Sequence, residues 1–468
     1  MRQLVSRAHK PRGGKIVLSD KQPLDRGGYA DLDSGIREKK RKIRKRPELL
    51  DNQVNLEPSS ERVVIPPCAP IAAEKRASFE LAHILDRLNL QSALLNSLPP
   101  YVGGLDTRVD AAAHAVIAAY QHIFRPTSTS EVLFIKRNHE AIGLLRAKID
   151  VCDTSLATVI LLSLANSLSN GNPWDTRNTH IQGMNAILGS RPQGEKLNDF
   201  ARSTVRTCTA TNFIAYCTSG KASPWDHERW LGQDMNYGVQ NSTSEFAKLK
   251  DASFRLLVKL PGFIKLVREY RQCSMKQTCD NRITRITVAT AKQLLSVEDL
   301  PAEDAMLYRL RVVPTEDTSK AAIMKYSYSI GTLRDTDTAL FYWTLRLMLI
   351  RLSLRLNGHN AFDEARFLAE AERLAVNVIM VLPGEFEGHL YPPGQALALV
   401  VLWGALSDRE FLRDTPTSVI SRWVWRKLET LLPLPAEHIN PGSLDATADL
   451  FAGGPIAGLL VDIERQAA

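Results

Sequence analysis

Cysteine and histidine are the residue types best suited to metal binding or nucleophilic chemistry, and neither is arranged for it in this sequence. No two of the six cysteines form the C-x2-C pair that is typical of zinc and redox sites, and they are too sparse for a disulfide framework. The ten histidines form neither H-x3-H nor H-E-x2-H. We therefore predict no metal site and reduced, mostly buried thiols at these positions: Cys68, Cys152, Cys208, Cys217, Cys273 and Cys279.

The short patterns that mark catalytic sites are also missing. There is no G-x-x-x-x-G-K-[ST] phosphate loop, no G-x-G-x-x-G after a strand and no G-x-S-x-G elbow. Helical enzymes of the terpene cyclase kind use a D-D-x2-D helix, which neither Arg334-Asp-Thr-Asp337 nor Asn198-Asp199 matches. Paired carboxylates such as Glu303/Asp304 are normally solvated on helices. The sequence thus predicts no catalytic residue, no cofactor and a protein that is not an enzyme.

Positive charge is concentrated near the N-terminus, where it could contact phosphate. Residues 1–50 carry 15 Lys/Arg against six Asp/Glu, whereas the remaining residues carry 44 against 45. The densest run is Arg37–Arg46, in which eight of ten residues are basic. Such a run is typical of a nuclear localisation signal or of weak, non-specific contact with nucleic acid. The basic residues are Arg37, Lys39, Lys40, Arg41, Lys42, Arg44, Lys45 and Arg46.

The basic run belongs to a longer segment that is not expected to fold. Residues 1–75 are rich in Gly, Pro, Lys, Arg and Asp without a sustained apolar period, and the proline-rich stretch Pro66–Pro70 lies near their boundary with the next segment. We predict a disordered basic arm here. The sequence has no apolar run of the ~18 residues that a membrane-spanning helix needs and no apolar stretch like a signal peptide. No membrane contact is therefore expected, and the nucleus is the predicted location.

Residues 76–440 have the apolar spacing of one helix after another, so we predict an all-α multi-helix domain. Asp106 is placed to cap the alanine-rich helix Val109–Phe124, and Ser128 or Ser130 to cap the next helix. One face of that next helix is formed by Val132, Ile135, His139, Ile142 and Leu145. Further helices are expected over Asp153–Leu168, His180–Leu188, Lys196–Tyr216, Ser244–Gln272, Thr284–Leu295, Thr336–Leu356, Phe362–Val381, Pro393–Leu406 and Val419–Leu432.

The remaining residues are expected to be less regular. Only a short apolar run around Arg311–Val313 is typical of a strand. The C-terminal residues 441–468 are rich in Gly, Ala and Asp, and we predict an irregular tail.

One stretch in the middle of the chain carries a resemblance to a known family. The apolar helix from Asp153 is followed by Trp174 and then by H-x2-G-x3-[IL]-L-x2-R, which begins at His180. This order resembles the regulatory domain of fungal zinc binuclear cluster (Zn2Cys6) transcription factors. The matching positions are Trp174, His180, Gly183, Ile187, Leu188 and Arg191.

The resemblance implies structural roles for these residues rather than catalytic ones. We expect Trp174 to close the end of the apolar helix and His180 to be a hydrogen-bonded histidine at a helix start. Gly183 would permit close contact between helices, since glycine in a helix costs ~1 kcal/mol relative to alanine. Arg191 would cap carbonyl groups at the helix end.

Softer similarities extend over most of the chain from about residue 105. His139–Arg146 is similar to a helix end of the family, and Phe362–Val381 to its late helix. Gly28–Lys39 is similar to the stretch that often follows the zinc cluster. The cluster itself needs six closely spaced cysteines, and residues 1–28 contain none. We therefore expect no autonomous zinc-dependent recognition of DNA.

The resemblance implies a transcription regulator that acts through its helical domain by binding partners or an effector. The partner could be a related Zn2Cys6 factor or a second copy of this chain, and pairing with such a factor could repress it. Two alternatives remain open at this point. One is a helical protein-interaction scaffold unrelated to transcription, and the other is a truncated gene model of a full Zn2Cys6 factor.

Overall fold

The computed structural model describes residues 73–456 with several gaps. The gaps are 89–92, 125, 170–172, 193–194, 228–229, 231–243, 276–280, 298, 332, 357–361, 383–392, 409–416 and 432–439. Within the described residues the protein consists of sixteen α-helices, one 3-10 helix and two short strands, which confirms the all-α class. The predicted arm of residues 1–75 lies outside this part, except for its last three residues, which begin α1.

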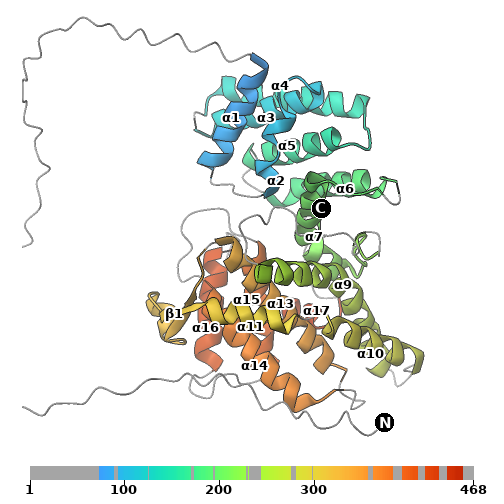
Figure 1. Cartoon of the computed structure of the whole chain (residues 1–468), viewed down its shortest axis with the longest axis vertical. Coiled ribbons are helices and arrows are strands. Elements are labelled where there is room, and N and C mark those ends of the chain that lie inside the picture. The colour runs from blue at the N-terminus through green and yellow to red at the C-terminus, as the bar shows by residue number, and fades with distance from the viewer. Residues whose placement is uncertain are drawn as a thin grey trace, which may run out of the picture. The chain divides into compact units, whose positions relative to one another are not determined.

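A first group of helices, blue to green in Figure 1, surrounds one apolar core. These elements are α1 (Ala73–Arg87), α2 (Ala93–Asn96), η1 (Pro99–Tyr101), α3 (Thr107–Phe124), α4 (Ser128–Ala147), α5 (Asp153–Ser169), α6 (Pro173–Gly189) and α7 (Asp199–Ser219). The alanines of α3 are almost all buried, so that α4 and α5 can pack closely against it. α5 buries most of its first three turns, as expected for a helix that is apolar on nearly every side.

A second group, yellow-green to red in Figure 1, surrounds another apolar core. Its elements are α9 (Ser244–Met275), α10 (Asn281–Leu295), α11 (Leu300–Arg309), β1 (Arg311–Pro314), α12 (Thr318–Ala321), β2 (Tyr326–Ser329), α13 (Leu333–Leu354), α14 (Glu364–Val381), α15 (Pro393–Asp408), α16 (Thr417–Leu431) and α17 (Pro441–Phe451). The strands pair antiparallel, with Val312 opposite Tyr328, so the expected short strand near Arg311–Val313 is confirmed.

The long helix α9 contributes to both cores. Phe254 and Val258 belong to the first core, whereas residues before and after them, from Phe246 to Val267, belong to the second. Pro261 lies inside the helix, between Leu260 and Phe263 of the second core. A proline at such a position removes one hydrogen bond of the helix, so α9 is weakened near Pro261.

The predicted capping residue is confirmed for α3 and is wrong for α4. Asp106 caps α3 as predicted, because its Oδ1 accepts a hydrogen bond from the Arg108 backbone N–H at 2.9 Å. α4 is capped by Thr127 instead of Ser128 or Ser130. Thr127 Oγ1 accepts from the backbone N–H of Ser130, and the Ser130 hydroxyl accepts from the backbone N–H of Thr127, each at 3.0 Å. This reciprocal pair is a capping box, and it starts the helix at Ser128.

The prediction of an irregular tail from residue 441 is wrong for its first part. Pro441–Phe451 form helix α17, which begins with a capping box between Asn440 and Ser443. Leu444, Leu450 and Phe451 are buried in the second core. The glycine and alanine content concealed this helix, because small residues are compatible with close helix packing as well as with loops.

No described helix is both long enough and apolar enough to cross a membrane.

Candidate functional site

The motif residues that carry the family resemblance lie where α5 and α6 pack together. Ile187 and Leu188 are buried in the first core. The Nε2 atom of His180 lies 2.8 Å from the Nδ2 atom of Asn166 on α5. Burial lowers the pKa of His180, which favours the neutral ring whose nitrogen accepts this hydrogen bond. Asn166 Oδ1 in turn accepts from Asn138 Nδ2 of α4 at 3.1 Å. His180 is thus a hydrogen-bonded histidine, as expected, and it joins three helices. It does not lie at a helix start as predicted, because α6 begins at Pro173.

Two of the structural roles predicted for this motif are wrong. A Cβ atom added at Gly183 would meet only Val159 Cγ1 at 3.8 Å, which is an ordinary contact, so close packing does not require glycine there. Within the described part of the chain, the Arg191 side chain caps no carbonyl group. Its guanidinium forms an ion pair with Asp153 at the start of α5 and lies 3.5 Å from the carboxylate of Glu195. α6 begins at Pro173, and the side chain of Trp174 lies outside the described residues.

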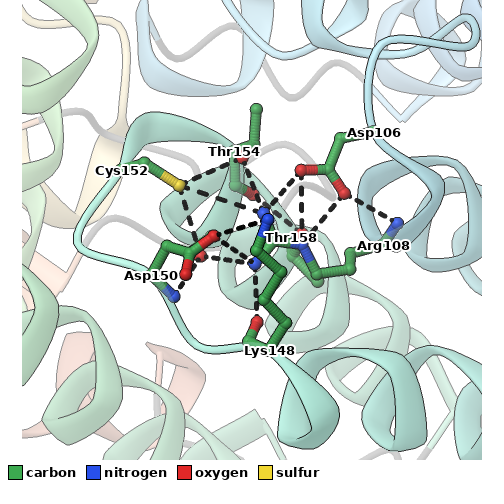
Figure 2. A network of polar contacts seen from close by, with 8 residues as sticks. Asp106, Arg108, Lys148, Asp150, Cys152, Thr154 and Thr158 are labelled. Atoms are coloured by element: carbon green, nitrogen blue, oxygen red, sulfur yellow. Dashed lines mark hydrogen bonds and ion pairs between the residues drawn. The ribbon is translucent and has the colours of Figure 1, made fainter.

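The same end of α5 holds a second, larger polar network, which is shown in Figure 2. Arg108 is almost completely buried. Its Nε and NH2 atoms donate to the two carboxylate oxygens of Asp106 at 2.9 and 2.6 Å. NH1 donates to the backbone carbonyl of Lys148 at 2.6 Å and to the hydroxyl of Ser155 at 3.1 Å. This arginine therefore ties the start of α3 to the end of α4 and the start of α5.

Charge is strongly stabilised within this network. The side-chain hydrogen bond from Arg108 holds the pKa of Asp106 far below its usual value, and the same bond raises the pKa of Arg108. Asp150 lies at 3.5 Å from Arg108 NH1. Because the guanidinium is buried and surrounded by acceptors, it is engaged within the protein rather than available to bind an external anion.

Cys152 lies at the edge of this network, directly before α5. Burial alone would raise the pKa of its thiol, but hydrogen bonds with Ser155 and Thr154 and the charge of Arg108 outweigh burial and lower it. Sγ lies 3.1 Å from Thr154 Oγ1. A thiolate is the reactive form of cysteine, so Cys152 is better prepared for covalent modification than the buried Cys208 and Cys217. Cys152 is half-buried. The hydrogen-bond partners of its Sγ atom are Arg108, Thr154 and Ser155, and none of these is a general base.

The other described cysteines differ in their surroundings. Cys208 and Cys217 are fully buried, as predicted. Burial raises the pKa of Cys208 to about 12 and also raises that of Cys217. Among the described residues, no group of three or more His, Cys, Asp or Glu side chains is arranged to hold a metal ion.

A third network, in the second core, corrects the prediction that Glu303 is solvated. Glu303 is buried, and its Oε1 accepts from Trp343 Nε1 at 2.8 Å and from Arg373 NH1 at 2.7 Å. The network joins α11, α13 and α14. It is an internal connection like the one around Arg108.

The described surface includes one cluster of exposed apolar side chains at the turn between α3 and α4. We call it the α3–α4 surface. Phe124 is 60% and Val132 64% exposed, and α4 buries Phe134 and Ala141 instead of the face formed by Val132, Ile135 and His139. The ring of Tyr120 packs on Phe124 with centroids 4.5 Å apart. The members of the surface are Ile123, Phe124, Val132, Leu133 and Ile135.

Sequence reasoning placed neither Arg108 nor the α3–α4 surface among the functional candidates. Asp106-Thr-Arg108 is visible in the sequence as a cap followed by a basic residue, but its partners come from residues 148–155. The predicted basic site from Arg37 to Arg46 lies outside the described residues. Comparisons with protein-family models, curated proteins and solved structures found no match.

Proposed function

We propose that this chain is a transcription regulator-like protein that acts through its helical domain by binding a protein partner or an effector molecule. The observation that carries the proposal is the α3–α4 surface. Its five apolar side chains are between 40% and 64% exposed on two consecutive helices. Groups of exposed apolar side chains are typical of interaction sites, and burying them on a partner would be favourable.

The polar networks support binding in preference to catalysis. The buried charges of Arg108 and Glu303 are paired with groups of the same chain. Such pairs stabilise a fixed arrangement of helices, on which a docking surface keeps its shape. The resemblance of the α5–α6 segment to regulatory domains of Zn2Cys6 transcription factors supports the same proposal.

The basic run Arg37–Arg46 supports the part of the proposal that concerns the nucleus. Eight basic residues in ten suit an import receptor, and they would also attract the phosphates of nucleic acid. This attraction is independent of sequence and falls steeply as salt rises. We therefore propose a nuclear location and only weak, non-specific contact with DNA, without zinc-dependent recognition.

A helical protein-interaction scaffold unrelated to transcription is the second candidate. The α3–α4 surface favours it equally, because any protein partner could cover an apolar surface. The two candidates differ in where the protein acts and in whether the basic run matters.

Localisation of a tagged chain in fungal cells tests the choice. Replacing Arg41, Lys42, Arg44 and Lys45 by glutamine should move the protein from the nucleus to the cytosol. The control replaces four basic residues elsewhere in the same arm, and the protein should remain nuclear. If the protein is cytosolic and neither set of substitutions changes its location, the result would favour the scaffold. The control residues are Arg2, Arg7, Lys10 and Arg12.

Binding to random duplex DNA, with zinc added or chelated, tests the mode of contact. We expect binding at low salt that disappears at physiological salt and is the same with and without zinc. Binding should be lost in the variant with glutamine at the four basic positions from Arg41 to Lys45. Sequence-selective binding that resists salt would contradict the proposal, since it would require a DNA-reading surface.

A further inference from the structure

We propose that α4 pairs in parallel with α4 of a second copy of this chain. The exposed face of α4 forms the seam, and ion pairs between Glu131 of one copy and Lys136 of the other set its direction. This inference deepens the proposed function, on which it rests, by naming the partner of the α3–α4 surface.

The seam follows the spacing of a coiled coil. Val132, Ile135, His139 and Ile142 are separated by three, four and three residues, which is the alternation of a and d positions in a heptad. Val132, Ile135 and His139 are exposed, whereas Ile142 is half-buried and packs against the first core. A narrow apolar stripe with this spacing suits a single partner helix better than the broad face of a globular core.

The opposite side of α4 is already occupied. Phe134 and Ala141, seven residues apart, are buried in the first core and fix which side of the helix faces the protein. α4 packs mainly on α3 and less on α5, and its ribbon lies at the upper edge of the view in Figure 1. The described elements therefore leave the first turns of α4 uncovered.

The flanking charges determine the direction of pairing. With Val132 at position a, Glu131 occupies g and Lys136 occupies e of the next heptad. In a parallel pair, g of one helix lies beside the e position five residues later in its partner. Each Glu131 therefore faces a Lys136 of the other copy, and the two-fold symmetry forms this ion pair twice. An antiparallel pair would bring g to g and e to e, without this match.

Both charged side chains are free to make the contact. Glu131 and Lys136 are exposed, and the ion pairs within the described part of the chain involve neither of them. The neighbouring Arg137 and Glu140 are paired with each other at 3.0 Å. Glu140 lies at position b, away from the seam, and so supplies a matched control.

The experiment is sedimentation analysis of the purified full chain over a range of concentrations. We expect a dimer for the wild type. Glu131→Lys and Lys136→Glu should each weaken dimerisation at least ~10-fold, since each creates two like-charge contacts. Glu140→Lys makes the same charge change off the seam and should leave dimerisation unchanged. Val132→Ser with Ile135→Ser should weaken it at least ~30-fold by removing apolar contacts at the centre of the seam.

Rescue provides the decisive measurement. The double variant Glu131→Lys with Lys136→Glu restores opposite charges and should dimerise again. A mixture of the two single variants should form a heterodimer, because each substituted side chain would then face the substituted side chain of the other variant, and these two carry opposite charges. The unchanged Glu131 and Lys136 would face each other at the second contact. A wild type that stays monomeric, or single variants that dimerise normally, would overturn the proposal. So would a double variant that fails to recover while remaining folded.

Failure of this inference is distinguishable from failure of the proposed function. A monomeric chain that enters the nucleus through Arg37–Arg46 would refute the pairing of α4 and leave the regulator proposal standing. A dimer that stays in the cytosol would do the reverse.

Discussion

At the scale of single residues, Cys152 is expected to be alkylated more readily than the fully buried thiols of Cys208 and Cys217. Hydrogen bonds and Arg108 lower its pKa, whereas burial raises the pKa of Cys208 to about 12. Iodoacetamide at neutral pH should therefore modify Cys152 in the folded protein long before Cys208 or Cys217, as peptide mass analysis would reveal. Thr154→Val removes one of the hydrogen bonds and should slow the reaction several-fold. Equal rates for all three thiols in the native protein would contradict this prediction.

The positive charge of the buried Lys320 side chain lowers the free energy of unfolding at neutral pH. It is 2% exposed, and its Nζ donates to the carbonyls of Met380 and Leu382 at 3.1 and 2.7 Å, at the end of α14. Burial lowers its pKa to about 8. Between about pH 8 and the ordinary lysine value of ~10.4, the unfolded chain binds more protons than the folded chain. The contribution of this residue to the free energy of unfolding therefore rises with pH in that window.

The measurement compares the wild type with Lys320→Met by urea denaturation at pH 7 and pH 10. The wild type should gain up to ~3 kcal/mol relative to the variant over this interval, since one pKa unit corresponds to ~1.4 kcal/mol. Other lysines and tyrosines titrate in both proteins, so the difference between the two isolates Lys320. A constant difference across the interval would show that its amine is not perturbed.

At the scale of elements, two glycines should respond in opposite directions to the same substitution. A Cβ at Gly404 of α15 would lie 2.5 Å from the guanidinium nitrogens of Arg351 and 2.7 Å from Ala448 Cβ. Arg351 is itself buried and held by Asp408 at 2.8 Å. Gly404→Ala should therefore lower the free energy of unfolding by ~1–3 kcal/mol. A loss below ~0.5 kcal/mol would mean that α13, α15 and α17 adjust freely.

Gly143 of α4 is the matched control. A Cβ there would meet no atom within 4 Å, and the residue is exposed inside a helix. Gly143→Ala should raise the free energy of unfolding by ~1 kcal/mol, because alanine restricts the unfolded chain and favours the helix. Urea denaturation of both variants measures the contrast.

The sequence predicted most helices and the cap at Asp106, because helical spacing and capping are local properties. It could not predict which face of α4 packs, since Val132 and Ile135 form as regular an apolar stripe as Phe134 and Ala141 do. That choice depends on α3 and α5. Gly183 and Arg191 were assigned the wrong roles for the same reason. The space around Gly183 and the position of Asp153 near Arg191 are set by packing between helices.

At the scale of the whole molecule, the two apolar cores share helices α7 and α9, and this predicts how the protein unfolds. Phe254 of α9 is buried in the first core and Phe263 in the second, nine residues further along. If α9 transmits stability, damage to either core should loosen both. Phe254→Leu should then increase amide hydrogen exchange in α3 and also in α14, whose buried side chains belong to the second core, and Phe263→Leu should do the same in reverse. α7 connects the cores in the same way, because Val205 is buried in the first core and Phe213 in the second. If Phe254→Leu accelerates exchange in α3 alone, the two cores unfold as separate units despite the helices that they share. That outcome would also mean that a partner bound at the α3–α4 surface stabilises only the first core, because binding stabilises the folded unit to which the binding surface belongs.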